Sequence, residues 1–495
     1  MQKICLTLCE KTLEENLKTL EKYRKYIDVV ELRVDKLIPD ERFQIRHFPA
    51  LAGIPAILTI RRKHDGGFFE NSETARVTLI ANALANAKAD RRLNFAYVDM
   101  EEDLDVPSLE EAARAFGTRI IRSLHQFERP GPNIAARVKA LARTGDEIVK
   151  YACLAETLDD TLAVFKAAGE LKSYDKILIA MGEAGVCSRI LTAKTGSQWT
   201  YSYAPSPADA APPAPGQIDP KTLCNVYRYR NVREDSDVYG ILGYPLKVTG
   251  SPLFFNTVFS REKMNCVYVP FPSESADKFF PLARHLNVRG VSVTIPHKQN
   301  VLKHLTSQSV EVSGIGACNT IVRTDKGWAG YNTDTLGFSD SILHFMGKKN
   351  FRGLKITIVG AGGAARAVAY QIWRLHGKAF IVNRTLSGAE DLAEKFGFRA
   401  GGLDSTSAKY IKKHSDLIIN TTSAGMSPPY NDDPLRMYKF YGHEVVMDLI
   451  YMPEQTAFLS RAAAAGCATL NGFDMLTRQA RSQYKYFFGA DYPEV

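Results

Sequence analysis

The chain has 495 residues, of which 45% are hydrophobic and 24% charged, and its formal net charge is +9. This length exceeds the roughly 250–300 residues at which single hydrophobic cores stop growing, so we expect two or three domains. The basic residues are scattered and no nucleic-acid-binding motif occurs, which argues against a nucleic-acid partner and favours anionic small-molecule substrates.

The cysteines and the first residues indicate where the protein works. Eight cysteines are widely spread and form no CxxC pair, which argues for a reducing compartment and against disulfides or a structural zinc. No metal is therefore expected. The N-terminus lacks the pattern of a signal peptide, and no apolar run reaches the length of about 18 residues that a membrane span needs. We expect a cytoplasmic protein without a membrane segment.

The first half of the chain alternates short apolar strands with helical patterns, for example over residues 13–25, 73–89 and 134–142. Such alternation implies parallel βαβ units. Eight units within about 220 residues fit a closed (β/α)8 TIM barrel better than an open sheet, which more often has five or six strands. The predicted strands are Lys3–Leu8, Val29–Val34, Ala56–Ile60, Phe95–Met100, Arg119–Leu124, Glu147–Ala152, Lys176–Ala180 and Trp199–Tyr203.

Polar residues recur where these strands end. In a (β/α)8 barrel the catalytic groups lie at the C-terminal ends of the strands. Any one of these residues alone is more easily explained as a surface charge or a satisfied core residue. Together, at the same end of successive strands, they predict an active site. The residues are Glu31, Arg33, Arg61, His125, Lys150 and Arg189.

Lys150 interrupts the apolar segment EIVKYAC and carries the most specific chemistry. Burial of its amine beside arginines favours the neutral form, which is a nucleophile towards a ketone. His125 can then take a proton from the carbon next to the resulting iminium and return one to a leaving hydroxyl. The arginines suit a substrate carboxylate, because a guanidinium matches it bidentately.

The motifs ELRVD, TIRR…DGG, SLHQF, VKYA, MGEAGVCSR and APGQ resemble the type I 3-dehydroquinate dehydratases over residues 1–222. The resemblance implies a Schiff base on Lys150 and acid–base catalysis by His125. Two positions depart from the family: Asp65 replaces a glutamate that orients the histidine, and Pro213 replaces a serine of the lid. The substrate-binding residues that the resemblance implies are Glu31, Arg33, Arg61, Arg189 and Gln217.

A Pro/Ala-rich run over residues 204–215 precedes a second βα series, which begins after Val238. In this series Lys298, Asn319 and Asp334 each follow a predicted strand or turn. Ordinary turn chemistry would account for each residue by itself. Together they would form an acid–base pair and the group that orients it, in one cleft.

Further along, the buried strand Lys355–Val359, a glycine-rich turn and a helix over 364–374 form a GxGxxG/A dinucleotide fingerprint in its required context. The next strand, Ala379–Val382, leads to Arg384, which suits the 2′-phosphate of NADP. We therefore predict NADP as the cofactor. The predicted cofactor-binding residues are Gly360, Ala361, Gly362, Gly363, Ala364, Asn383, Arg384, Thr385, Thr421, Thr422, Ser423, Met426, Tyr451 and Gly472.

The motifs YPLxxTGSP, VSVTIPHK, GACNT, GYNTD, VGAGGAAR, NRT, NTTSAGM and NGFDML…Q resemble the shikimate dehydrogenases over residues 236–490. The resemblance implies that Lys298 and Asp334 serve the carbonyl that receives the hydride. Thr249 replaces a serine, which bears on the choice between shikimate and quinate, and Gly388 replaces a basic residue of the 2′-phosphate clamp. The implied substrate-binding residues are Thr249, Ser251, Thr294, Asn319 and Gln479.

The whole chain thus resembles the fused dehydroquinate dehydratase–shikimate dehydrogenases, with 3-dehydroquinate, 3-dehydroshikimate and shikimate as small-molecule partners. The expected domains are a barrel (1–222), a substrate-binding domain (236–340 with the helix 474–490) and a Rossmann NADP domain (350–473). One alternative is a catabolic quinate/shikimate dehydrogenase that uses NAD. Another is a fusion in which one half is only a scaffold or a metabolite sensor. A monomer is expected, with a dimer as the alternative.

Overall fold

The computed structural model describes residues 1–84, 92–205, 212–246, 249–426 and 431–493. The chain divides into two compact units, Met1–Val288 and Arg289–Val495. The boundary falls in strand β11 (Val288–Val293), inside the predicted substrate-binding domain, and the predicted domain bounds stay predictions. None of the helices in the described ranges combines the length and the apolar character that a membrane crossing requires.

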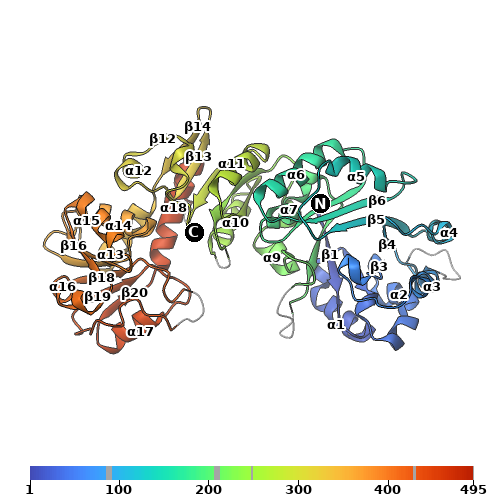
Figure 1. Ribbon diagram of the computed structural model, residues 1–495, viewed down its shortest axis with the longest axis horizontal. Coiled ribbons are helices and arrows are strands. Elements are labelled where there is room, and N and C mark those ends of the chain that lie inside the picture. Colours follow the sequence, from blue (N-terminus) through green and yellow to red (C-terminus); the bar gives the residue numbers. More distant parts are fainter. Residues whose placement is uncertain (85–91, 206–211, 247–248, 427–430, 494–495) are drawn as a thin grey trace. The chain divides into compact units, whose positions relative to one another are not determined.

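The first unit is built on eight parallel strands in the order β7-β6-β5-β4-β3-β2-β1-β8. A parallel bridge between Lys176 and Ser197 links the two ends of this sheet, so the barrel is nearly closed. The prediction of an eight-stranded barrel is confirmed (Figure 1). The strands are β1 (Lys3–Leu8), β2 (Val29–Arg33), β3 (Ala56–Thr59), β4 (Tyr97–Glu101), β5 (Arg119–Gln126), β6 (Ile148–Leu154), β7 (Lys176–Met181) and β8 (Trp199–Tyr203).

Helices follow most of these strands. Helix α1 begins with a capping box, in which Thr12 accepts from the Glu15 N–H and the Glu15 side chain accepts from the Thr12 N–H. Parts of two predicted segments lie outside the described residues: 85–89 at the end of a helix and 206–211 within the Pro/Ala-rich run. The helices are α1 (Leu13–Tyr23), α2 (Phe48–Ala52), α3 (Glu73–Leu84), α4 (Pro107–Ala115), α5 (Ile134–Leu141), α6 (Leu158–Glu170), α7 (Val186–Ile190), α8 (Thr192–Thr195) and α9 (Pro220–Asn225).

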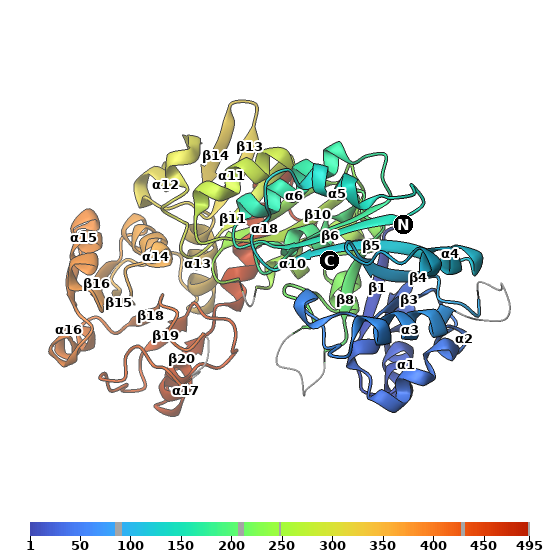
Figure 2. The same cartoon turned by 45° about the vertical axis from the view of Figure 1, so that its right-hand side comes forward.

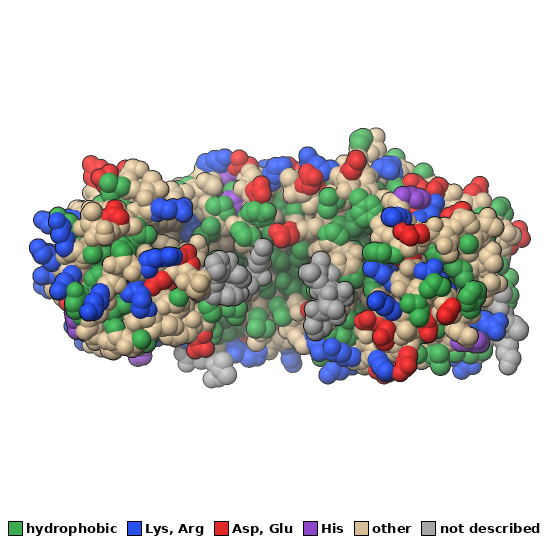
Figure 3. All heavy atoms as spheres, turned by 60° about the horizontal axis from the view of Figure 1, so that its bottom comes forward, with side chains coloured by type: hydrophobic (Ala, Val, Ile, Leu, Met, Phe, Trp, Pro, Cys, Tyr) green, Lys and Arg blue, Asp and Glu red, His purple; other side chains and the backbone are tan. Residues whose placement is uncertain are grey.

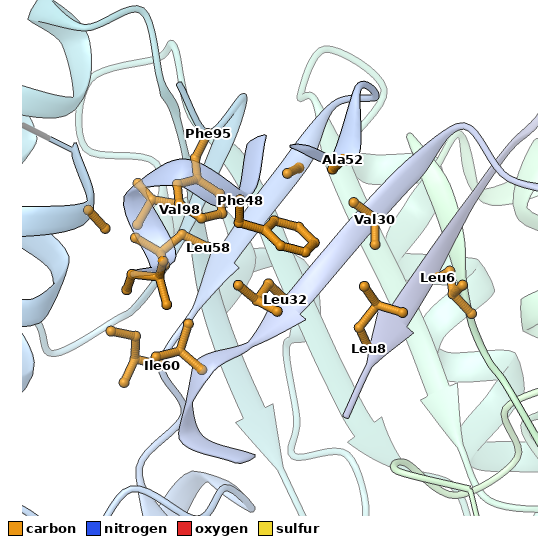
Figure 4. Packing of buried hydrophobic residues seen from close by; sticks show 14 of the residues in the cluster. Leu6, Leu8, Val30, Leu32, Phe48, Ala52, Leu58, Ile60, Phe95 and Val98 are labelled. Atoms are coloured by element: carbon orange, nitrogen blue, oxygen red, sulfur yellow. The ribbon is translucent and has the colours of Figure 1, made fainter. Parts of the chain in front are cut away.

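The barrel strands bury side chains on both faces. On the outer face, Phe48 of α2 lies over Val30 and Leu32 of β2, and all three are fully buried (Figure 4). A second apolar cluster from alternate strand positions, including Ile57 and Ile148, fills the interior. Alternate side chains of a strand point into the barrel. The inward-pointing positions beyond this apolar cluster, at the C-terminal ends of the strands, can therefore carry polar groups.

The first unit continues with β9 (Asp237–Gly243), α10 (Ser251–Arg261), β10 (Cys266–Pro272) and α11 (Ala276–His285). Strands β9 and β10 pair in parallel over their whole length, with Asp237 opposite Cys266. This is one βαβ step, as the second βα series predicts.

The second unit begins with β11, which pairs antiparallel with β13 (Thr320–Thr324). Strand β13 forms a hairpin with β14 (Gly327–Tyr331), and β12 (Leu305–Gln308) runs parallel to β14. The sequence prediction missed this hairpin, although the Asp325–Gly327 turn between two alternating segments was a usable signal. Helices α12 (Val310–Ile315) and α13 (Asp334–Phe345) flank these strands in the chain.

The rest of the second unit is a six-stranded parallel sheet in the order β17-β16-β15-β18-β19-β20. One apolar cluster joins this sheet to α13, α14, α15 and α18, and a second joins it to α16 and α17. The labelled helices and strands of this layer can be followed in Figure 2. Helices on both faces define a doubly wound Rossmann-type layer, as predicted. The elements are β15 (Lys355–Val359), α14 (Gly363–Arg374), β16 (Lys378–Asn383), α15 (Leu386–Phe396), β17 (Arg399–Gly402), α16 (Ala408–Lys412), β18 (Leu417–Asn420), β19 (Val445–Asp448), α17 (Ala457–Ala464), β20 (Ala468–Leu470) and α18 (Phe473–Phe488).

The surface agrees with the scattered charge of the sequence. On the face drawn in Figure 3, basic and acidic side chains occur among each other rather than as one large basic area.

Candidate active sites

The C-terminal ends of the barrel strands surround one cavity of about 90 Å³. On β6 the polar residue Lys150 comes two positions after the interior residue Ile148, so both point to the same face of the strand. The structure therefore brings together every residue that the sequence predicted for this site. Those lining residues are Glu31, Arg33, Arg61, His125, Lys150, Arg189 and Gln217.

Lys150 is 4% exposed and is held by a residue that the sequence analysis missed, Asp99 of β4. Its Nζ donates to Asp99 Oδ2 at 2.8 Å, and Arg61 pairs with Asp99 Oδ1 at 2.7 Å and with Glu101 at 2.8 Å. Burial alone would raise the pKa of Asp99, but the charges of Arg61 and Lys150 hold it well below its usual range. The amine thus lies in a buried network of paired charges, and the ring centroid of Tyr201 lies 4.5 Å from Nζ.

His125 lies at the end of β5, and its pKa is lowered well below 6.5 by burial and by the positive charges of Arg61 and Lys150. The imidazole is therefore neutral near pH 7 and can accept a proton. Its Nδ1 is buried without a hydrogen-bond partner in the described ranges. Asp65 lines the same cavity, and its carboxylate accepts from Arg62 Nε at 2.6 Å.

The two remaining arginines of the barrel site differ in their partners. Arg33 makes two bonds to Asp35, at 2.9 and 2.7 Å, so its charge is already balanced. Arg189 is 2% exposed, donates from Nη2 to the Pro215 carbonyl at 2.9 Å, and has no partner for Nε and Nη1 among the described residues. Burial lowers the pKa of Arg189 to about 10. A buried guanidinium without a counter-charge is a ready site for a carboxylate.

The segment over residues 212–217 closes one side of this cavity. Gly216 has φ +76°, and a Cβ atom there would lie 2.5 Å from the Gly182 carbonyl oxygen. The Gly182 N–H also donates to the Pro215 carbonyl at 3.1 Å. Only glycine fits this close approach, which explains the APGQ motif and places Pro213 and Gln217 in the cavity wall.

The second site lies in the second unit and again contains a lysine–aspartate pair. Lys298 Nζ donates to Asp334 Oδ2 at 2.6 Å, and Asn319 Nδ2 donates to Asp334 Oδ1 at 2.8 Å. Gln479 of α18 accepts from the same Asn319 amide at 3.3 Å. Asp334 is the first residue of α13, where the helix dipole favours a carboxylate. Thr294 lies in the turn between β11 and Lys298.

The sequence analysis missed Gln483, one helical turn after Gln479. Its side chain accepts from Ser292 Oγ at 2.7 Å and donates to Thr320 Oγ1 at 3.1 Å, which fixes α18 against β11 and β13. The spacing of four residues on one helix face was the signal that could have found it. The predicted residues Thr249 and Ser251 belong to the first unit, where the Ser251 N–H donates to Thr249 Oγ1 at 3.4 Å.

The glycine-rich turn opens onto a cavity of about 810 Å³, which also contains Lys298. Arg436 is a further cation in its wall, paired with Asp432 at 2.7 Å. The predicted residues Thr385, Met426, Tyr451 and Gly472 are outside the lining of this cavity. The predicted residues that do line it are Gly360, Ala361, Gly362, Gly363, Ala364, Asn383, Arg384, Thr421, Thr422 and Ser423.

The turn has the features that a dinucleotide needs. Gly360 has φ +109°, and a Cβ atom there would lie 2.6 Å from Thr421 Oγ1. A Cβ atom on Gly362 would meet no described atom within 4 Å, so a ligand can approach this backbone closely. Helix α14 begins at Gly363, with its N–H groups at the cavity. These residues fit a pyrophosphate at a helix N-terminus.

Two cavities on α/β scaffolds, each lined by a lysine that bonds an aspartate, define a chain with two enzyme-like sites. Comparison with known families gives the same division. Residues 4–234 match the type I 3-dehydroquinase family, residues 241–321 match the shikimate dehydrogenase substrate binding domain, and residues 344–428 match the shikimate/quinate 5-dehydrogenase family.

Relatives of the full length exist. The chloroplastic bifunctional 3-dehydroquinate dehydratase/shikimate dehydrogenase of Arabidopsis thaliana is 30% identical over 489 residues, covering 94% of this chain and 78% of that protein. A shikimate dehydrogenase (NADP(+)) of Caldanaerobacter subterraneus is 35% identical over 261 residues, covering 51% of this chain and 91% of that protein. The solved structure of dehydroquinate dehydratase and shikimate dehydrogenase from S. pombe AroM is 24% identical, covers 99% of this chain and 96% of its own, and has a TM-score of 0.42. The chain belongs to the bifunctional 3-dehydroquinate dehydratase/shikimate dehydrogenase family.

Proposed function

We propose that this chain dehydrates 3-dehydroquinate in the barrel and reduces the product, 3-dehydroshikimate, to shikimate with NADPH in the second unit. The observation that carries the proposal is the pair of cavities, one with a buried lysine among ion pairs and one with a lysine beside a dinucleotide-type turn. Each half belongs to a family with the corresponding activity.

In the barrel, Lys150 Nζ adds to the ketone carbon, and the carbonyl oxygen leaves as water to give an iminium. His125, neutral for the reason given above, takes the proton from the adjacent carbon and returns it to the departing hydroxyl. Hydrolysis of the imine then releases the enone and restores the amine. Arg189, with its unpaired Nε and Nη1, binds the substrate carboxylate.

In the second unit, NADPH supplies the hydride when it is bound along the glycine-rich turn. Lys298 hydrogen-bonds the carbonyl oxygen and gives it a proton, while Asp334 orients the lysine through their 2.6 Å contact. Asn319 holds Asp334 in place and, with Gln479 and Thr294, offers polar groups to the substrate hydroxyls. Thr249 and Ser251, which belong to the first unit, stay predictions from the sequence.

Arg384 supports NADP as the cofactor, because it is a cation of the cavity wall directly after β16. Homologues that match the second half are named shikimate dehydrogenase (NADP(+)). Gly388 stands near the start of α15, where a basic residue would give the 2′-phosphate a second cation beside Arg384. Without that cation we expect a preference for NADPH over NADH rather than an absolute requirement. We also propose a reducing, cytoplasmic compartment, which the eight free cysteines support. The proposed oligomeric state is a monomer, with a dimer as the alternative.

A coupled assay tests the proposed function. Purified chain, 3-dehydroquinate and NADPH should give loss of nicotinamide absorbance without any added enzyme. Lys150→Ala should stop this reaction but leave reduction of added 3-dehydroshikimate unchanged, and Lys298→Ala should do the reverse. Accumulation of enone without NADPH oxidation would contradict the reductase half, and oxidation of quinate with NAD would support the catabolic alternative.

A further inference from the structure

Gly363 occupies a variable position of the GxGxxG/A fingerprint, since the required glycines are Gly360 and Gly362 and the third small residue is Ala365. Nucleotide binding therefore does not explain why this position is a glycine. The structure offers a different reason, because the nearest atoms to the missing side chain belong to Lys298.

The stem of Lys298 lies against Gly363. A Cβ atom on Gly363 would lie 3.0 Å from Cδ, 3.1 Å from Cβ and 3.5 Å from Cγ of Lys298. Carbon atoms in contact prefer a separation of about 3.5–4.0 Å, so a methyl group at this position would push the lysine away. By contrast, a Cβ atom on the adjacent Gly362 would meet nothing described within 4 Å.

Lys298 has little freedom to yield, because both of its ends are fixed. Its carbonyl oxygen accepts from the Cys318 N–H at 2.7 Å. Its ammonium donates to Asp334 at 2.6 Å, and Asp334 is itself held by Asn319 at 2.8 Å. A displacement of the stem must therefore lengthen the bond to Asp334 or move the backbone near Cys318.

We propose that Gly363 is a positioning residue for the reduction: its lack of a side chain allows Lys298 to lie on the cofactor-binding turn and sets where the ammonium meets Asp334 and the substrate carbonyl. The inference deepens the proposed reductase function and rests on it for its kinetic consequence. The same contact joins the turn that would hold the dinucleotide to the residue that serves the carbonyl, so both are placed by one packing arrangement.

The test is Gly363→Ala in the full-length chain, with three readouts. We expect kcat for reduction of 3-dehydroshikimate to fall by about two- to tenfold, because a contact this tight moves the lysine by only a few tenths of an ångström, and misplacement by about 1 Å can cost 10²-fold. The Kd for NADPH, measured by quenching of protein fluorescence, should stay within about twofold, because the substitution acts on the lysine. The barrel of the Gly363→Ala chain should dehydrate 3-dehydroquinate at the unchanged rate. This activity shows that the variant is folded.

Gly169→Ala is the matched control. Gly169 lies within α6, where a Cβ atom would meet nothing described within 4 Å, and it has no part in either site. This variant should leave both activities unchanged.

A crystal structure of the Gly363→Ala chain decides the question without activity. The inference predicts a Lys298–Asp334 distance longer than the present 2.6 Å. An unchanged distance with unchanged kcat would overturn it, as would a loss of NADPH affinity that accounts for the whole loss of rate. If the wild-type chain failed to reduce 3-dehydroshikimate, the proposed function would fail, whereas the crystal structure would still test the contact.

Discussion

The two sites use the same pair of side chains in different surroundings. In the barrel, Lys150 bonds Asp99 at 2.8 Å, both are at most 4% exposed, and Lys150 lines a cavity of about 90 Å³. In the second unit, Lys298 bonds Asp334 at 2.6 Å at the edge of a cavity of about 810 Å³. The comparison teaches that the lysine–aspartate pair does not by itself define the chemistry. Lys150, buried and with a neutral histidine beside it, suits covalent attack. Lys298, beside a dinucleotide-binding turn, suits proton donation.

The largest expected effect comes from removing each lysine. Lys150→Ala should reduce dehydration by more than about 10⁴-fold, because a covalent nucleophile has no substitute. Lys298→Ala should reduce the other activity by about 10²–10⁴-fold, the usual contribution of a general acid. Separate assays of the two steps measure both effects in each variant. An equal fold-loss of dehydration in Lys150→Ala and of reduction in Lys298→Ala would contradict the difference between the two lysines.

Substitution of the two aspartates, Asp99 and Asp334, should change the free energy of unfolding by different amounts. Asp99→Asn leaves Arg61 and Lys150 without their shared counter-charge, and breaking a buried pair costs roughly 3–5 kcal/mol of unfolding free energy. Asp334→Asn acts on a lysine whose side chain is 14% exposed, so its cost in unfolding free energy should be smaller. Denaturant unfolding monitored for each unit makes the comparison, and a larger loss for Asp334→Asn would contradict it.

Sequence alone predicted most of the barrel site and less of the second site. Strand β8 was predicted with its bounds because its aromatic and polar residues alternate, and the strand ends identified Lys150 and His125. Asp99 was missed although Asp99 and Glu101 alternate in YVDME as Glu31 and Arg33 do in ELR. The partner of a buried charge is set by strand order, and only the parallel pairing of β4 with β5 and β5 with β6 brings Asp99 to Lys150.

In the second half, the glycine-rich turn correctly predicted a cavity beside it. The other motifs did not show which of their residues line this cavity. Met426 belongs to the NTTSAGM motif and Tyr451 follows a strand of the same half, and yet both lie outside the cavity lining. Gly472 packs instead on the end of β19, where a Cβ atom would lie 2.1 Å from the Leu449 carbonyl oxygen. Close packing therefore explains why residue 472 is a glycine. A sequence motif alone does not distinguish such packing from contact with a ligand.

The pH dependence should also separate the sites. His125 must be neutral to take a proton, and its pKa is lowered well below 6.5 by burial and neighbouring cations. Dehydration should therefore persist below pH 6.5 and fall only as the pH drops through this lowered pKa. The kcat/KM profile of dehydration between pH 4.5 and 8 checks this, and an acid limb centred at or above about 6.5, the unperturbed histidine pKa, would contradict it.

The smallest expected effect concerns the cofactor. A Cβ atom on Gly388 would lie 3.3 Å from Asn383 Nδ2 and 3.8 Å from Ala361 Cβ, next to the wall that carries Arg384. Gly388→Lys should raise the preference for NADPH over NADH by about tenfold, the value of one charge-assisted hydrogen bond. The ratio of kcat/KM for the two cofactors measures it. Gly388→Gln, of similar length and without charge, is the control and should leave the ratio unchanged.

The most direct test of the account is borohydride trapping on the full chain. Reduction in the presence of 3-dehydroshikimate, followed by peptide mass spectrometry, should give one adduct per chain on the peptide that contains Lys150. The peptide that contains Lys298 should stay unmodified, although its lysine also lies beside a carboxylate. Adducts on both lysines, or on neither, would contradict the claim that two similar lysine–aspartate pairs perform different chemistry.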